Sequence, residues 1–235
     1  MSTDAVVIWG ELLWDRFLEG GDQLGGAPAN LAWHLGQAGG WAQLVTRVGD
    51  DEDGRRAVAR LAEVIDTSLV QVDPTRATGE VTVQLENGEP RYRLHPGRAW
   101  EHIACTPEVT AAIGEAGVFV FGTLAQRKPE GLAAWRTAVT AAARCLKVCD
   151  LNLRPTDQDA PAIREALEAA DVIKLNDREL ATLRDWFGWR DPIAELRARP
   201  RTIAVTHGAA GSTLHGDAGS IEIPPTLAPH GGDNV

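Results

Sequence analysis

The strongest constraint on the fold is a regular alternation of two patterns along the chain. Short apolar runs that suit strands buried on both faces alternate with longer segments in which apolar residues recur at helical spacing. The predicted strands are residues 5–10, 41–48, 117–122, 146–153, 171–176 and 202–208. The predicted helices are residues 28–39, 51–64, 129–145, 161–170 and 176–188. This alternation predicts an α/β fold in which helices cover a mostly parallel sheet.

Residues 77–100 interrupt the alternation. Two strand-like runs lie on either side of the sequence ENGEP, which contains an Asn-Gly hairpin signal. Together with the run at residues 12–18, they predict a small antiparallel sheet that projects from the main body. Its second face needs a cover, either substrate, the parent domain or a second copy, and a surface hairpin without a role is the alternative. We expect one domain over residues 1–235, with a β lid formed by about residues 12–24 and 77–103.

Charge and composition exclude several classes of protein. The net charge is -10 and the 23 Lys and Arg residues are dispersed, which disfavours a nucleic-acid partner. The three cysteines are too few for a disulfide scaffold and fit a reducing compartment. The first residues lack the pattern of a signal peptide, and no run approaches the roughly 18 to 20 apolar residues of a membrane span. We therefore expect a soluble, cytoplasmic protein with no nucleic-acid or membrane partner.

A candidate binding segment begins with two glycines before the first predicted helix. Gly25 and Gly26 allow the backbone to approach a ligand closely, and Asn30 offers both a donor and an acceptor to a hydroxylated molecule. Ordinary turn chemistry is the alternative interpretation. The phosphate-loop pattern that ends in Gly-Lys-Ser or Gly-Lys-Thr is absent from the sequence.

Two further sets of polar residues lie at the ends of predicted strands. In a parallel sheet, ligands bind at the carboxyl ends of the strands. Asp150, Asn152 and Arg154 alternate, which predicts that they share one face of a strand end, and a buried polar network is the alternative. Asn176 opens a helix with Glu179 three positions later, a spacing that also suits a simple helix cap.

Together these segments resemble the ribokinase-like (PfkB) carbohydrate kinases, in which two glycines precede a small residue, an Asn and a helix. The match continues in family order through GELLWD, FGTLAQR, DLNLRP, KLNDREL and TIAVTHGAAG, and it is most similar to the fructokinase-type branch. The resemblance implies a three-layer α/β sandwich with a β lid, which transfers the ATP γ-phosphoryl group to a sugar hydroxyl, with fructose or a similar ketose as acceptor. The alternatives are a sugar- or nucleotide-binding protein without catalysis and a nucleoside kinase of the same fold. Trp14 and Trp100 keep the nucleoside option open, because aromatic rings could stack on a ligand.

The resemblance also implies roles for individual residues. On the sugar side they are Asp15, Gly25, Gly26, Asn30 and Arg154. On the nucleotide side they are Asn176, Thr206, Gly208 and Gly211. Glu179 would act on Mg²⁺ through water, because magnesium usually keeps several waters. Asp233 lies where the family leaves room for a monovalent cation such as K⁺.

The last six residues, HGGDNV, match the positions that precede a Gly-Ala-Gly-Asp motif in the family. The resemblance therefore implies a general-base Asp and an anion-binding helix beyond Val235. We expect the 235-residue polypeptide by itself to be close to inactive. We also expect it to expose apolar surface, with marginal stability or aggregation. The lid is expected either to close over substrate or to pair with a second copy in a homodimer.

Overall fold

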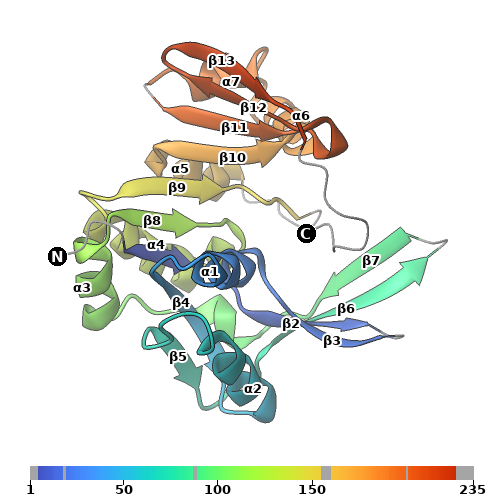
Figure 1. The fold of residues 1–235 in the computed structure, drawn as a ribbon, viewed down its shortest axis with the longest axis vertical. Coiled ribbons are helices and arrows are strands. Elements are labelled where there is room, and N and C mark those ends of the chain that lie inside the picture. Colours follow the sequence, from blue (N-terminus) through green and yellow to red (C-terminus); the bar gives the residue numbers. More distant parts are fainter. Residues whose placement is uncertain (1–4, 18–19, 87–88, 155–159, 200, 226–235) are drawn as a thin grey trace.

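A computed structural model describes residues 5–17, 20–86, 89–154, 160–199 and 201–225. Its main sheet has nine strands in the order β13-β12-β11-β10-β9-β8-β1-β4-β5 (Figure 1). The strands are β1 (Val6–Trp9), β4 (Ala42–Gly49), β5 (Val70–Asp73), β8 (Val118–Phe121), β9 (Leu146–Asp150), β10 (Val172–Asn176), β11 (Thr202–Thr206), β12 (Ser212–Gly216) and β13 (Gly219–Ile223). From β5 to β11 neighbouring strands are parallel, and β12 and β13 are antiparallel. The predicted mostly parallel α/β fold is confirmed.

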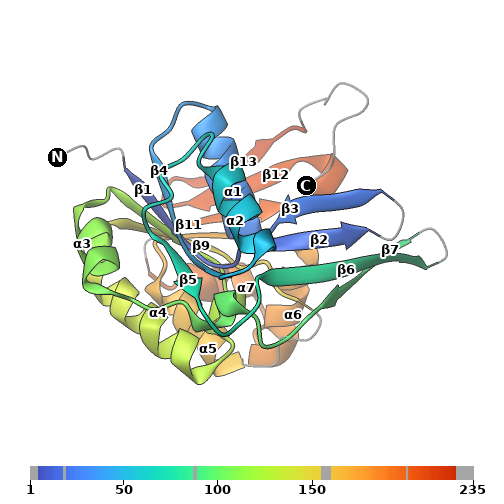
Figure 2. The same ribbon diagram turned by 90° about the horizontal axis from the view of Figure 1, so that it is seen from below.

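Helices cover both faces of this sheet, as Figure 2 shows. One face carries α3 (Pro107–Glu115), α4 (Pro129–Ala141), α5 (Ala160–Ala169), α6 (Asp177–Phe187) and the short α7 (Pro192–Leu196). The other face carries α1 (Ala27–Gln37) and α2 (Glu52–Leu61). Short 3-10 segments span Ala99–His102, Leu124–Gln126 and Gly208–Ala210. The result is a three-layer arrangement.

Strand β1 illustrates why the central strands are apolar throughout. Successive side chains of a strand point to opposite faces. Val7 and Trp9 pack in the cluster that includes α3 and α4, whereas Ile8 packs in the cluster beneath α1 and α2. All three side chains are fully buried, which is the pattern expected of a strand enclosed on both faces of a parallel sheet.

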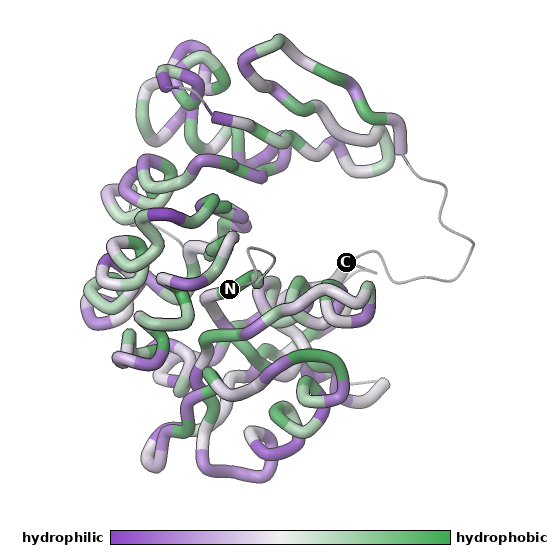
Figure 3. The backbone as a smooth tube through the Cα atoms, turned by 60° about the vertical axis from the view of Figure 1, so that its left-hand side comes forward, coloured by the Kyte–Doolittle hydropathy of each residue, from purple (hydrophilic) through white to green (hydrophobic). Residues whose placement is uncertain are grey.

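Among the described residues, no helix covers the α1 side of β10–β13 or of the start of β9, which we call the open face (Figure 3). Alternation along each strand places Leu146, Ile221 and Ile223 on this side, at 48%, 66% and 41% exposure. Ile221 pairs in register with Leu214, so the apolar side chains are contiguous across β12 and β13. The open face therefore presents apolar surface to solvent, which favours association.

A second sheet of four strands projects from the carboxyl end of the main sheet, in the order β3-β2-β6-β7 (Figure 1). Its strands are β2 (Leu13–Phe17), β3 (Gly21–Gly25), β6 (Gly79–Glu86) and β7 (Glu89–Leu94). The predicted hairpin around ENGEP, β6–β7, is antiparallel, and β2 and β3 also pair antiparallel; the two pairs join through a parallel pair of β2 and β6. The parallel pairing arises because β2 follows β1 and β6 follows β5, so both segments leave parallel strands in the same direction.

Six described strands and α-helices were not predicted from periodicity, namely β3, β5, β12, β13, α3 and α7. The strands are only four or five residues long, and β12 and β13 contain glycines that weaken a strand pattern. Helix α3 carried a usable signal, because Thr106 caps it and Pro107 occupies its first turn. No helix in the described part of the chain is long and apolar enough to cross a bilayer.

Candidate active site

The sugar-side prediction centres on the start of α1, where two glycines permit close packing. Gly26 has φ 100°, in the left-handed region, and a Cβ there would overlap the backbone oxygen of Glu11. A Cβ on Gly25 would overlap the carboxylate of Asp15. Gly26 therefore needs glycine for backbone reasons alone, whereas a side chain at Gly25 would require Asp15 to move, because Asp15 lies directly against the turn that opens α1.

Asp15 occupies the middle of β2, opposite Gln23 of β3. Burial raises the pKa of Asp15, and the positive charge of Arg154 partly offsets that effect. Asn30 lies one turn into α1, since its backbone N–H donates to the Gly26 carbonyl oxygen at 2.9 Å. The structure thus brings the predicted sugar-side residues to one place, with Arg154 approaching from the chain that follows β9.

Glu11 also belongs to this site, although the sequence interpretation assigned it no role. It lies between β1 and β2 and is only 2% exposed. The backbone N–H of Ala27, the first residue of α1, favours the ionised form of the Glu11 carboxylate. The pKa of Glu11 is raised to about 7, chiefly by burial; the charge of nearby Asp150 contributes to the rise and that of Arg154 opposes it. The available signal was an acidic residue placed directly after a wholly apolar strand.

A pocket lies at the carboxyl ends of β1, β8 and β9, beside the start of α1. We call it the strand-end pocket, and its polar lining comes from Glu11, Thr123, Asp150 and Asn152. The predicted strand 146–153 ends early, because Asn152 has φ 39° and breaks the extended backbone. The expected alternation of Asp150, Asn152 and Arg154 along one strand is therefore wrong, although the first two do line the same pocket.

On the nucleotide side, Asn176 and Glu179 form a complete capping box at the start of α6. The Asn176 side-chain oxygen accepts the Glu179 N–H at 3.0 Å, and Glu179 Oε2 accepts the Asn176 N–H at 2.7 Å. Glu179 Oε1 accepts a second backbone N–H, from Leu153, also at 2.7 Å. Burial raises the pKa of Glu179, while these two hydrogen bonds and the charge of Lys174 oppose the rise. The capping interpretation is therefore realised, and Glu179 also holds the chain that follows β9.

The glycine-rich loop after β11 lies beside this cap. Thr206 pairs in register with Asn176, so the ends of β10 and β11 are adjacent. The His207 N–H donates to the Gly211 carbonyl oxygen at 2.8 Å and closes the loop, with positive φ angles at Gly208 and Gly211. All four predicted nucleotide-side residues thus lie near one another at the carboxyl end of the sheet.

Asp150 connects the two halves of the site. Its Oδ1 lies 3.0 Å from the Lys174 ammonium nitrogen. Its negative charge raises the pKa values of both Glu11 and Glu179, so it lies within electrostatic reach of each. The described residues hold no cluster of three or more metal-ligating side chains. Glu179 and Asp150 nevertheless suit Mg²⁺, which takes one or two carboxylates plus water and phosphate oxygens. Asp233 lies outside the described residues.

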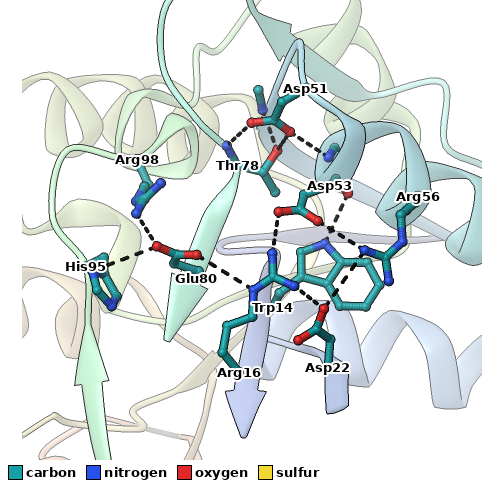
Figure 4. Close-up of polar contacts among 12 residues, drawn as sticks. Trp14, Arg16, Asp22, Asp51, Asp53, Arg56, Thr78, Glu80, His95 and Arg98 are labelled. Atoms are coloured by element: carbon teal, nitrogen blue, oxygen red, sulfur yellow. Dashed lines mark hydrogen bonds and ion pairs between the residues drawn. The ribbon is translucent and has the colours of Figure 1, made fainter. Parts of the chain in front are cut away.

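The two tryptophans proposed to stack on a ligand are engaged elsewhere. Trp14 is 7% exposed, donates its indole N–H to the Asp53 carbonyl oxygen at 3.0 Å and lies under Arg56 at 4.7 Å from the ring centre (Figure 4). Trp100 is fully buried in the core beside Arg127. Neither ring is available to stack on a ligand, because the aromatic area of both is used for packing.

A polar cluster anchors the small sheet to α2 (Figure 4). Arg16 of β2 pairs with Asp53 of α2 and also lies 3.7 Å from Glu80 of β6. Asp51, which caps α2, accepts the Thr78 N–H at 2.8 Å and the Thr78 hydroxyl at 2.6 Å. These contacts fix the strand that carries Asp15 relative to the main body.

Comparison with known proteins gives a consistent result. The sequence pattern of the pfkB family carbohydrate kinases matches residues 19–229. A fructokinase of Klebsiella pneumoniae is 31% identical over 222 residues, which cover 87% of this chain and 70% of that protein. Fructokinase-1 of Zea mays is 28% identical over 226 residues, covering 89% of this chain and 70% of that protein. The chain spans between 62% and 70% of the length of the curated relatives that it matches.

Solved structures support the fold. A fructokinase from Xylella fastidiosa, crystallised with bound ATP, superposes with a TM-score of 0.89 at 24% identity, over 97% of this chain and 76% of that one. A Halothermothrix orenii fructokinase gives a TM-score of 0.81 at 23% identity, over 94% of this chain and 86% of that one. The expected three-layer sandwich with a small β sheet is therefore confirmed.

Proposed function

The chain belongs to the pfkB family of carbohydrate kinases, and from that premise we propose that it contributes the substrate sites for ATP-dependent phosphorylation of a sugar hydroxyl, with fructose or a similar ketose as acceptor. Relatives named fructokinase support the choice of sugar. The proposed use of ATP and the three free cysteines both fit the cytoplasm.

The observation that carries this proposal is the position of the Asp15 carboxylate against the glycine turn at the start of α1, within electrostatic reach of Arg154. A half-buried carboxylate held against a tight glycine turn can accept hydrogen bonds from sugar hydroxyls, while Asn30 offers an amide from the same turn. Arg154 supplies a positive charge beside the acceptor, where a transferring phosphoryl group needs stabilisation. Positioning and charge stabilisation are the main demands of phosphoryl transfer.

The nucleotide is proposed to lie across the ends of β10 and β11, along Asn176, Thr206, Gly208 and Gly211. Glu179, with Asp150 nearby, would hold Mg²⁺ through water, and the ion would neutralise charge on the phosphates. Each Glu179 carboxylate oxygen accepts a backbone N–H at 2.7 Å, so the fold already fixes the orientation of this side chain.

We further propose that the small sheet acts as a lid, or as the contact with a second copy. The face of this sheet that carries Asp15 also carries Val81 in register with it, followed by Val83 beside Phe17. Asp15 is thus surrounded on this face by apolar side chains. Such a face suits closure over the ring of a sugar or contact with another apolar face.

A nucleoside acceptor is less well supported than a sugar. A purine needs an apolar or aromatic slot, and the two tryptophans that could have formed one are buried in other contacts. Competition between fructose and adenosine for the purified protein tests this choice. Displacement of fructose by micromolar adenosine would favour the nucleoside alternative.

Binding without turnover is the expectation for the 235-residue polypeptide. Its sequence contains no Gly-Ala-Gly-Asp motif, and loss of a general base typically slows a reaction by about two to four powers of ten. We expect titration calorimetry to detect fructose and ATP binding, and a coupled assay to detect little ADP formation with fructose. Appreciable phosphorylation by the purified polypeptide would refute the second expectation and leave the first intact.

The sugar site is tested by Asp15→Asn, with Asp66→Asn as a matched control. Asp66 is also half-buried and accepts hydrogen bonds, but it precedes β5 at the opposite end of the sheet. Asp15→Asn should weaken fructose binding by at least about tenfold, because a buried carboxylate acceptor contributes about 1.5 to 3 kcal/mol. The control should bind fructose as the wild type does, and equal losses in both variants would argue against the proposed site.

A further inference from the structure

The glycine-rich loop after β11 contains a side chain to which the proposed function gives no role. The loop runs from His207 to Gly211, and we call it the nucleotide loop. Its other residues are glycine or alanine, and Gly208, Ala209 and Ala210 are exposed. His207 therefore carries the only side chain of this loop that can form a hydrogen bond.

Both ring nitrogens of His207 are engaged, each with a different element of the fold. Nδ1 lies 2.9 Å and 3.0 Å from the two carboxylate oxygens of Asp177, the first residue of α6. Nε2 lies 2.9 Å from the hydroxyl oxygen of Thr213 in β12. An ionised carboxylate only accepts hydrogen bonds, so Nδ1 carries a proton and donates it to Asp177. A hydroxyl group can donate or accept, so the contact with Thr213 suits either protonation state of Nε2.

The backbone of the nucleotide loop fixes its ends but not the position of its tip. Thr206 pairs with Ser212, so the two flanking strands hold the ends. The His207 N–H donates to the Gly211 oxygen at 2.8 Å, a bond that stays within the loop. Gly208 and Gly211 have φ angles of 57° and 97°, and glycine changes backbone conformation at little cost. Among the described residues, the hydrogen bonds that tie the loop to α6 are those of His207.

The partner of His207 on α6 belongs to the other half of the proposed nucleotide site. Asp177 directly follows Asn176 and lies in the same first helical turn as Glu179. Glu179 is the side chain proposed to hold Mg²⁺ through water. The contact between His207 and Asp177 therefore joins the two elements that the nucleotide is proposed to span.

We propose that His207 is a positioning residue for the nucleotide, and that it pairs with Asp177 and Thr213 to hold the nucleotide loop in the conformation that binds ATP. This inference rests on the proposed sugar-kinase function. Since both ring nitrogens are bonded within the protein, His207 acts on ATP through the loop. Its removal lowers the fraction of molecules whose loop is ready to bind, and the apparent affinity for ATP falls by that fraction.

The test is titration calorimetry of the full 235-residue chain with ATP and Mg²⁺, and separately with fructose. His207→Ala should weaken ATP binding at least about tenfold, because a hydrogen bond to a charged group has an effect of that order. Fructose affinity should stay within about twofold of the wild type, because the sugar site is formed by other segments of the chain.

His215→Ala is the matched control. His215 lies two positions beyond Thr213 on the same face of β12, and its Nδ1 lies 2.8 Å from the Ser220 hydroxyl oxygen. The control thus removes a second hydrogen-bonded histidine that does not contact the nucleotide loop. It should bind ATP as the wild type does.

Asp177→Asn gives a second line of evidence through a double-mutant cycle. It keeps an oxygen acceptor but removes the charge, so it should weaken ATP binding in the wild type and have little further effect in His207→Ala. Thr213→Val removes only the contact with Nε2 and serves where His207→Ala does not fold. It should also weaken ATP binding and leave fructose binding unchanged.

The inference is overturned if His207→Ala binds ATP as tightly as the wild type. It is also overturned if ATP and fructose affinities fall together, or if the effects of Asp177→Asn and His207→Ala are independent. Failure of the wild type to bind ATP would refute the proposed nucleotide site itself, and this inference with it.

Discussion

Replacement of Glu11 by Gln should raise the stability of the protein relative to the wild type progressively as pH increases from 5 to 8, and this effect requires no ligand. In the folded protein, burial raises the pKa of Glu11 from the ordinary 4.5 to about 7. The folded state therefore binds the proton more tightly than the unfolded state does. The stability that this group contributes is fully present below its pKa in the unfolded state, and it is lost as pH rises through its pKa of about 7 in the folded state.

The magnitude follows from the same two pKa values. A change from 4.5 to about 7 corresponds to about 3 kcal/mol in total, and about 2 to 3 kcal/mol of it falls between pH 5 and pH 8. Glu11→Gln has no proton to lose, so its free energy of unfolding relative to the wild type should rise by that amount over this pH range. The absolute difference at pH 5 reflects the lost hydrogen bonds and is a separate quantity.

The assay is urea unfolding at 25 °C, followed by tryptophan fluorescence and circular dichroism at several pH values. Glu195→Gln, on the exposed surface of α7, is the control for removal of one acid from the chain. A difference between Glu11→Gln and the wild type that stays constant from pH 5 to pH 8 would refute the reasoning. In that case the environment of Glu11 would have to be well hydrated.

Three further predictions concern the turn, the anchor and the open face. Gly25→Ala places a methyl group against the Asp15 carboxylate and should weaken fructose binding at least about tenfold in calorimetry, because displacement of a ligand-contacting group by an ångström has effects of that order. Asp51→Ala removes the acceptor for the Gly54 N–H at the cap of α2 and for Thr78, and should lower the free energy of unfolding in urea by about 2 to 4 kcal/mol. The pKa of Asp51 is lowered by these hydrogen bonds, so the wild type should lose this stabilisation only as pH falls below 3.8. Ile221→Glu should reduce aggregation in light scattering while changing the unfolding free energy by less than about 0.5 kcal/mol, because this side chain is 66% exposed on the open face. Unchanged aggregation would show that another surface drives association.

Local signals in the sequence were sufficient for much of the fold. The apolar pattern identified β1, β4, β8, β10 and β11, because each is a short, mainly apolar run between helical segments. The cap formed by Asn176 and Glu179 was also predictable, since its two hydrogen bonds join residues only three positions apart. The glycines before α1 were recognised by the same kind of local rule.

Tertiary structure alone decided the features that depend on distant neighbours. The apolar pattern predicted a strand through residue 153, but the backbone conformation of Asn152 ends it earlier. Trp14 packs against Arg56 of α2, and Trp100 is buried in the core. The parallel pairing of β2 with β6 follows from the directions of β1 and β5, which no local pattern contains. Glu11 acquired its raised pKa only because β1, α1 and the end of β9 enclose it. Burial and Coulombic interaction depend on distance in space, and in this protein the residues that set them come from segments far apart in the chain.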